Sequence, residues 1–429
     1  MKNRLLLNFD TFTKFTRVIK SLIGIPYFFL PLKIARSLSK KKNKHLSIKE
    51  RLLIDVSVLA SSDAKTGIQR VVRAISYNIS IHKTNKLKIA FIYADLNSEY
   101  KHLEFSVLNK NIYFRKTKHE VNPTSKDIFL GLDLCTNIIP RQARNLIKWK
   151  NKGVNFFFII HDLFPLEHPE WFKLFNCEAF KVWLKAIFII TDEIICVSKT
   201  VEVKVLNYLK AKNVSGLNSI KLNLLNLSGD IGNSSPSQGI PEKNLDIIEF
   251  IRSRKTLLIV GTIEPRKGHS EVLQAVEKLW ADCDLQINLM IIGAQGWMSE
   301  DISQKIRDSP EFCHRLLWLE NISDEALTIY YTECSAVLIA SYDEGFGLPV
   351  AEADYFGKQV IARDIPIFKE LLNDSVIFFK SNSDNSLENV IIRWINEPIF
   401  EGKISSLKTK VSWNDSTNQI LKITNECIF

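Results

Sequence analysis

Apolar positions from residue 51 onward fall into short continuous runs, separated by longer stretches with helical periodicity. Continuous runs such as N-F-F-F-I-I at 155–160 are typical of strands that are buried on both faces. Alternation of such strands with helices predicts parallel sheets wrapped by helices. In the first half we predict strands at Leu52–Val58, Ile89–Tyr93, Ile128–Leu132, Val154–Ile160, Glu193–Val197 and Leu222–Leu227, with helices between them such as Gly67–Ile81 and Ala179–Phe188.

A segment dense in Gly, Ser, Pro and Asn, residues 228–241, interrupts this alternation and is interpreted as a linker. The alternation then restarts, and 429 residues suit two domains. We expect two doubly wound α/β domains with a cleft between them at the carboxyl ends of both sheets. The predicted strands of the second half are Thr256–Gly261, Ile287–Ile292, Leu316–Leu319, Val337–Ala340, Val360–Ala362 and Val376–Phe379.

The basic charge of the chain is concentrated at its N-terminus. Residues 1–50 hold twelve Lys or Arg against two acidic residues, which accounts for the whole formal net charge of +10. The apolar stretch Leu22–Leu32 contains two prolines, has no evident cleavage site, and is shorter than the ~20 residues that span a bilayer. We consider two interpretations of this extension: contact of residues 1–45 with an anionic membrane surface, or a tail or extra helices on the body.

Composition excludes several classes of protein. The seven cysteines form no C-x-x-C pair, which argues against a disulfide framework and a zinc site and suits a reducing cytoplasm. The chain lacks H-E-x-x-H and G-K-[ST] motifs. Its D-C-D at 282–284 lies before a predicted strand, not after one, and is interpreted as a loop, so we predict no metal site and no P-loop. Basic residues of the body are not clustered with aromatic residues, so we expect no nucleic-acid partner.

The sharpest candidate for chemistry is S-Y-D-E-G-F-G-L-P-V-A-E-A at residues 341–353. A buried strand leads through a glycine-containing loop into a helix, whose N-terminus suits phosphate. Gly345 and Gly347 let the backbone approach a ligand closely. Glu344 and Glu352 can accept hydrogen bonds from sugar and ribose hydroxyls. The alternative is a plain strand–helix turn with solvated carboxylates.

Two further segments place polar groups at predicted strand ends. Arg266 and Lys267 lie in the segment V-G-T-I-E-P-R-K-G-H at 260–269. The forked guanidinium of an arginine beside the compact charge of a lysine suits a diphosphate. His161 and Asp162 follow directly after a predicted strand. They therefore lie at the carboxyl end of that strand, where open α/β sheets bind ligands. A solvated basic turn and a capped turn are the respective alternatives.

A fourth segment, residues 55–73, runs from a strand through a loop to a helix that starts at Gly67. Such a helix start can cradle a phosphate or a sugar. The alternative is an ordinary helix start, with the nearby arginines on exposed positions.

Taken in order on a two-domain pattern, these segments resemble the retaining glycosyltransferases of family 4, which have the GT-B fold. The resemblance covers about residues 51–429. E-G-F-G-L-P-V-A-E resembles that family's Glu–seven residues–Glu element, and G-T-I-E-P-R-K-G resembles its diphosphate loop. Many members carry Arg directly after the loop glycine, where this chain has Thr262, so Arg266 would have to supply that charge.

The resemblance implies a division of the chain and a role for each candidate residue. Domains are expected at 51–235 (acceptor) and 236–405 (nucleotide-sugar), after the extension 1–50, with 406–429 returning to the first domain. The implied catalytic residues are His161 and Glu344; the implied donor-binding residues are Arg266, Lys267, Gly345, Phe346, Gly347, Leu348 and Glu352; and Gly67 would line the acceptor or phosphate loop.

The implied activity is retaining transfer of a hexose from a nucleotide-sugar, without a metal or other cofactor, to a glycan or lipid-linked acceptor. The setting would be lipopolysaccharide, O-antigen or capsule synthesis, in the cytoplasm and peripherally at the inner face of the plasma membrane. Mannose is the preferred sugar by likeness, while UDP- and dTDP-sugars stay open. A nucleotide-sugar epimerase of GT-B fold and a non-catalytic glycan-binding scaffold are the alternatives, and donor turnover with and without acceptor separates the three.

Overall fold

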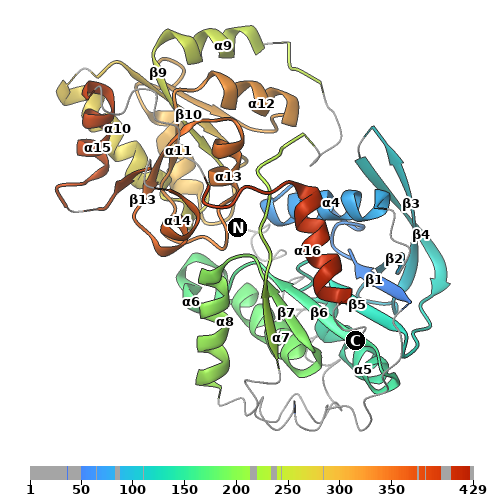
Figure 1. Ribbon diagram of the computed structural model, residues 1–429. Coiled ribbons are helices and arrows are strands. Elements are labelled where there is room, and N and C mark those ends of the chain that lie inside the picture. Colours follow the sequence, from blue (N-terminus) through green and yellow to red (C-terminus); the bar gives the residue numbers. More distant parts are fainter. Residues whose placement is uncertain are drawn as a thin grey trace, which may run out of the picture. The chain divides into compact units, whose positions relative to one another are not determined.

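A computed structural model defines two compact units of the chain: Met1–Leu225 with Asn414–Phe429, and Asn226–Trp413. Each unit is an α/β domain built on its own sheet (Figure 1), as the alternating apolar runs predict. The structure describes residues 36, 50–63, 65–82, 87–109, 111–212, 220–232, 239–242, 244–283, 285–373, 376–381, 383–397 and 407–425.

The sheet of the first unit has eight strands in the order β4-β3-β2-β1-β5-β6-β7-β8. The strands from β2 to β8 in this order are parallel, and those that were predicted begin within one residue of their predicted starts. The strands are β1 Arg51–Asp55, β2 Lys88–Tyr93, β3 Lys101–Leu108, β4 Asn111–Glu120, β5 Asp127–Gly131, β6 Asn155–Ile160, β7 Glu193–Cys196 and β8 Lys221–Leu224.

The hairpin β3–β4 is absent from the prediction. It pairs antiparallel within itself and joins β2 only through Ile92 and Tyr93. Most β3 and β4 side chains are exposed or half-buried, so the hairpin lacks the continuous apolar run that marks the other strands. Strand β1 also ends earlier than predicted, because Asp55 accepts a hydrogen bond from the Ser57 N–H at 3.0 Å and turns the chain.

Helices pack on the first sheet, and local signals explain several of their ends. Helix α4 begins at Gly67, as predicted, because Thr66 and Gln69 form a capping box before it. Helix α5 ends at a left-handed glycine, Gly153. The helices of this unit are α4 Gly67–Ile81, α5 Ile138–Lys152, α6 Phe164–Glu167, the 3₁₀ turn η1 Pro169–Trp171, α7 Leu174–Ile190, α8 Lys199–Ala211 and, beginning one residue before the boundary, α16 Trp413–Asn425.

The second unit has a six-stranded, fully parallel sheet in the order β11-β10-β9-β12-β13-β14. Its strands are β9 Lys255–Val260, β10 Ile287–Ile292, β11 Leu316–Leu319, β12 Ala336–Ile339, β13 Gln359–Arg363 and β14 Ile377–Phe379. Its helices are α9 Asn244–Ser253, the 3₁₀ turn η3 Pro265–Lys267, α10 His269–Cys283, α11 Glu300–Asp308, α12 Asp324–Glu333, α13 Leu348–Tyr355, α14 Pro366–Leu371 and α15 Leu387–Asn396.

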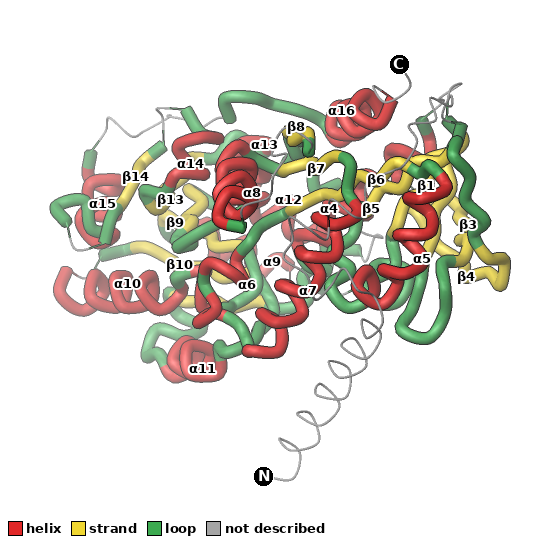
Figure 2. Tube along the Cα trace, turned by 90° about the horizontal axis from the view of Figure 1, so that it is seen from below, coloured by secondary structure: helices red, strands yellow, loops and turns green. Residues whose placement is uncertain are grey.

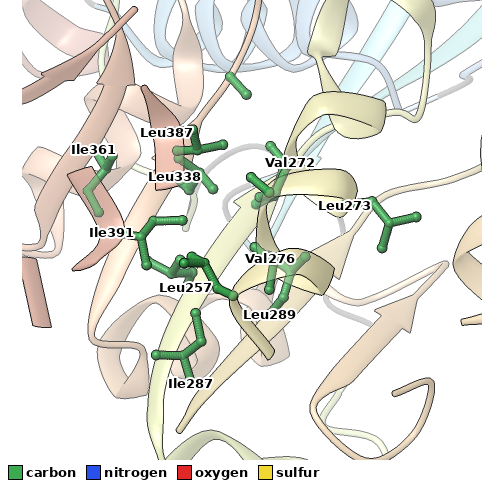
Figure 3. Close-up of a cluster of buried hydrophobic side chains, with 14 of the residues drawn as sticks. Leu257, Val272, Leu273, Val276, Ile287, Leu289, Leu338, Ile361, Leu387 and Ile391 are labelled. Carbon is green, nitrogen blue, oxygen red and sulfur yellow. The ribbon is translucent and has the colours of Figure 1, made fainter. Parts of the chain in front are cut away.

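A continuous apolar core covers one face of this second sheet. Strand residues such as Leu257 and Leu289 pack against Val276 of α10 and Ile391 of α15 (Figure 3). Figure 2 shows α10 and α11 on that side of the strands and α13 on the other. The strand ends are therefore held rigidly, and the loops at their carboxyl ends start from fixed positions.

The predicted membrane contact of residues 1–45 lies outside the described residues except for Arg36. The Arg36 guanidinium is buried and donates to the carbonyls of Phe188 and Thr191, at 2.6 and 2.9 Å, at the C-terminal end of α7. Burial lowers the pKa of Arg36 to about 10, against the opposing effect of Asp192. Within the part of the chain that the structure describes, each helix is too short or too polar to cross a bilayer.

Candidate functional site

Two loops of the second unit meet at the carboxyl ends of the neighbouring strands β9 and β12. The Tyr342 N–H, after β12, donates to the Arg266 carbonyl, after β9, at 2.8 Å. Gly268 has a φ of 72°, and a Cβ there would lie 2.3 Å from the Ala340 carbonyl oxygen. Only glycine permits both this conformation and this close approach. The strand order thus unites two motifs that are far apart in the sequence.

Glu344 is the centre of a compact charged cluster in these loops. One of its carboxylate oxygens accepts from Lys267 Nζ at 2.6 Å and from Ser341 Oγ at 2.8 Å. The other oxygen accepts from Arg266 Nη1 at 2.8 Å. Burial raises the pKa of Glu344, but the charges of Arg266 and Lys267 outweigh it and lower the pKa to about 2. Glu344 is therefore a carboxylate at any physiological pH.

Glu264 is a second buried carboxylate of the cluster and was not a sequence candidate. It forms an ion pair with Arg266 Nη2 at 2.6 Å, and its Oε2 has no hydrogen-bond partner. Burial raises the pKa of Glu264, although the neighbouring cations Arg266 and Lys267 oppose that effect. The cluster thus holds two cations against two carboxylates. An incoming dianion would compete with these carboxylates for the same donors.

The predicted backbone cradle, Gly345 to Leu348, leads directly into α13. Gly347 is the N-cap residue, with φ 86°, and provides no side-chain cap. Pro349 has no N–H, and the Val350 N–H donates to the Gly347 carbonyl at 2.9 Å, so Gly347 and Leu348 are the residues of this helix start whose N–H groups can serve an acceptor from outside. Phe346 is 7% exposed and anchors the loop in the core. The structure therefore places a helix N-terminus next to the charged cluster.

Glu352 lies inside α13, where it is 2% exposed. The Tyr331 hydroxyl of α12 donates to its Oε2 at 2.6 Å, and the Tyr331 ring stacks on Phe356 with centroids 5.2 Å apart. Tyr331 could not be predicted as a site residue from the sequence, because it is one apolar position among others in a helix. Its effect is to fix the orientation of the Glu352 carboxylate.

The other two candidates lie in the first unit. His161 directly follows β6 and is 8% exposed, and its Nε2 has no hydrogen-bond partner. Burial lowers the pKa of His161 to about 4, against a hydrogen bond with the Leu132 backbone that raises it. The imidazole is therefore neutral at pH 7. Gly67 is exposed at the first residue of α4.

A buried carboxylate also follows the strand next to the one that ends before His161. Asp133 follows β5, the neighbour of β6, and accepts the N–H groups of Leu59 at 2.7 Å and Leu134 at 2.9 Å. Burial raises the pKa of Asp133 to about 7 despite these hydrogen bonds. Its contacts hold the loop between β1 and α4. Among the described residues no group of three or more His, Cys, Asp or Glu could hold a metal ion.

Buried neutral histidines should make the fold sensitive to acid. Burial, with a smaller effect of Lys267, lowers the pKa of His269 to about 3, and neither of its ring nitrogens has a partner. An unfolded histidine takes up its proton near pH 6.5, so stability is lost as pH falls from 6.5 toward 3, at about 1.4 kcal/mol per pH unit. The second unit's melting temperature should therefore fall less between pH 7 and pH 5 in His269→Leu than in the wild type. His119→Leu, at an exposed position of β4, is the control, and an equal fall in all three proteins would contradict the assignment.

Comparison with known proteins places this geometry in a family. Residues 242–410 match the model of the glycosyl transferases group 1. The serotype-specific mannosyltransferase WbdA of Escherichia coli is 32% identical over 379 residues, which are 87% of this chain and 46% of WbdA. The O-antigen chain mannosyltransferase RfbU of Salmonella typhimurium is 29% identical over 147 residues, which are 34% of this chain and 40% of RfbU. The chain thus spans less than half the length of these curated relatives.

A solved structure agrees at the level of the fold. Anabaena HepE, crystallised with UDP and glucose, superimposes with a TM-score of 0.59 at 13% identity, covering 88% of this chain and 100% of HepE. The two parallel-sheet domains confirm the predicted fold class. Residues 242–410 therefore form a group 1 glycosyl transferase domain, and the chain has the GT-B fold.

Proposed function

We propose that the protein is a glycosyltransferase that moves a hexose, preferably mannose, from a nucleoside-diphosphate sugar to a growing glycan or lipid-linked acceptor in O-antigen-type synthesis. The observation that carries this proposal is the joining of Arg266, Lys267 and Glu344 at the carboxyl ends of β9 and β12. The preference for mannose is supported by the names of two relatives, WbdA and RfbU, both mannosyltransferases.

In this proposal the second unit binds the donor. Arg266 and Lys267 hold the diphosphate, and the uncapped N-terminus of α13 adds N–H donors and the positive end of the helix dipole. Gly345, Phe346, Gly347 and Leu348 provide the backbone of this cradle. Glu344 accepts from hydroxyls of the sugar, and Glu352, oriented by Tyr331, accepts from the ribose hydroxyls.

We further propose that transfer retains the anomeric configuration. A retaining transfer without an evident protein nucleophile suggests attack by the acceptor hydroxyl on the same face from which the diphosphate departs. Charge then develops on the leaving oxygens, where Arg266, Lys267 and the α13 dipole stabilise it. The neutral His161 would hold the donor sugar beside the acceptor, and Gly67 would line the acceptor loop. This scheme uses the nucleotide-sugar as its substrate and requires no metal.

The test is donor turnover by the purified chain. GDP-mannose, UDP-glucose and dTDP-glucose are incubated with and without a mannan oligosaccharide, and ¹H NMR of the new anomeric proton reports the linkage. We expect acceptor-dependent release of GDP and an α-linked product. Epimerisation without acceptor would favour the epimerase alternative. Binding without any turnover would favour the scaffold, and a β-linked product would refute retention.

The affinities of the corresponding nucleoside diphosphates can be ranked by thermal shift. A ligand that binds only the native state raises the melting temperature by mass action. GDP should raise it more than UDP or dTDP if mannose is the transferred sugar. A larger shift with UDP would overturn the assignment of the donor base while leaving the transferase proposal intact.

A further inference from the structure

A polar cluster lies directly behind the two site loops, in the second unit. Arg363, the last residue of β13, donates from Nη2 to Glu271 Oε2 at 2.6 Å and from Nη1 to Ser381 Oγ at 2.7 Å. Ser381 Oγ in turn donates to Glu271 Oε1 at 2.7 Å. The Arg363 guanidinium stacks on the Tyr342 ring, 4.2 Å from its centroid, and the Tyr342 hydroxyl donates to Glu271 at 3.2 Å.

This cluster reaches both site loops through the backbone. Arg363 Nε donates to the Ala340 carbonyl at 2.9 Å, which fixes the start of the loop that carries Glu344. Glu271 lies in the first turn of α10, three residues after Gly268. Tyr342, which the cluster holds by ring and hydroxyl, donates its N–H to the Arg266 carbonyl. One guanidinium thus ties the loop after β12 to the loop after β9.

Stability alone gives a poor account of such a pair. Arg363 is 7% exposed, so removing its guanidinium from water carries a desolvation cost, while the Glu271 side chain keeps 24% of its surface exposed. Apolar side chains of similar volume often replace a buried ion pair without loss of stability. The planar guanidinium instead provides direction, because its donors point along fixed lines to Ala340, Ser381 and Glu271 at once.

We infer that Arg363 and Glu271 are positioning residues that set the relative placement of the Glu344 loop and the Arg266–Lys267 loop. The inference rests on the proposed function for its catalytic consequence, although its structural part concerns the loops themselves. The pair touches no substrate. It acts by holding Tyr342 and Ala340, so that the hydrogen-bond donors of both loops point toward the same place.

The test is the double variant Arg363→Met/Glu271→Met, which keeps side-chain volume and removes both charges together. We expect the melting temperature to stay near that of the wild type. The kcat/KM for donor should fall ~10²-fold, as a displacement of about 1 Å at a reacting centre can cause. GDP or UDP, whichever the wild type binds, should also bind more weakly, and hydrogen exchange of the Tyr342 amide should accelerate.

A matched control lies in the same unit. Arg315 and Glu311 form a two-pronged ion pair at 2.7 and 2.8 Å, and Arg315 lies over the Trp280 ring, as Arg363 lies over Tyr342. This pair precedes β11, at the opposite ends of the strands from the site loops. Arg315→Met/Glu311→Met should leave kcat/KM, nucleotide binding and Tyr342 exchange unchanged.

The single variant Arg363→Lys decides the question if the double variant does not fold. Lysine keeps the charge opposite Glu271 but cannot reach Ala340, Ser381 and Glu271 together, so the same losses are expected in a folded protein. Wild-type kcat/KM and exchange in either folded variant would overturn the inference. Failure of both variants to fold would also overturn it, because the pair would then serve stability. A wild type that binds nucleotide without transferring sugar would refute the proposed function alone, since nucleotide affinity and exchange still report the loops.

Discussion

Replacing Lys267 by alanine should lower kcat/KM for the donor by ~10²-fold or more while leaving the fold intact. The Lys267 amine lies 2.6 Å from Glu344, and its stem lies over Gly261, where an added Cβ would be 3.4 Å from Cε. It is therefore held at the point where the diphosphate is expected. Its removal takes away one charge-assisted donor to a group that gains charge as the bond breaks.

The measurement is steady-state transfer together with the thermal shift that GDP or UDP produces. Both should collapse in Lys267→Ala, and the unliganded melting temperature should change little. Lys278→Ala is the control, because Lys278 is an exposed residue of α10 in the same unit. Lys267→Arg keeps the positive charge but changes the side chain that lies over Gly261. Transfer by this variant tests whether the charge alone is sufficient. Wild-type transfer in Lys267→Ala would remove this residue from the donor site.

The strands of both sheets could be predicted because most of them are buried on two faces. Such strands appear as continuous apolar runs, of which β6 and β10 are clear examples. The hairpin β3–β4 could not be predicted in this way, since one of its strands is exposed from Glu104 onward. Its formation depends on cross-strand pairs such as Phe105 with Phe114, both of which pack on Phe91.

The site residues could be named from their motifs, but their pairing could not. Glu344 is 78 residues from Arg266, and only the adjacency of β9 and β12 brings them together. Sequence reasoning assigned Glu344 to the sugar and the two cations to the diphosphate, as separate groups. The structure joins them in one ion-paired cluster. Glu264 and Arg363 were passed over because a single charged residue at a strand end has no signal of its own.

This joining leads to the second large prediction. Glu344→Gln should strengthen nucleoside-diphosphate binding and at the same time lower kcat for transfer by ~10²-fold. Glutamine keeps the size and the acceptor oxygen but removes a charge that now neutralises Arg266 and Lys267. A free diphosphate would then meet a more positive cluster, so its affinity should rise, and more at low salt than at high salt.

Glu264→Gln separates the two effects, because it removes the other carboxylate of the cluster, which pairs with Arg266 alone among the cations. Both variants should bind GDP or UDP more tightly in calorimetry at low ionic strength. Only Glu344→Gln should lose transfer, since Glu344 is the carboxylate that is expected to contact the sugar. If both variants bind nucleotide more tightly and transfer at the wild-type rate, Glu344 serves only to balance the cations. If affinity instead falls in Glu344→Gln, the carboxylate orders the two cations for the diphosphate, and the cost of losing that order exceeds the gain in charge.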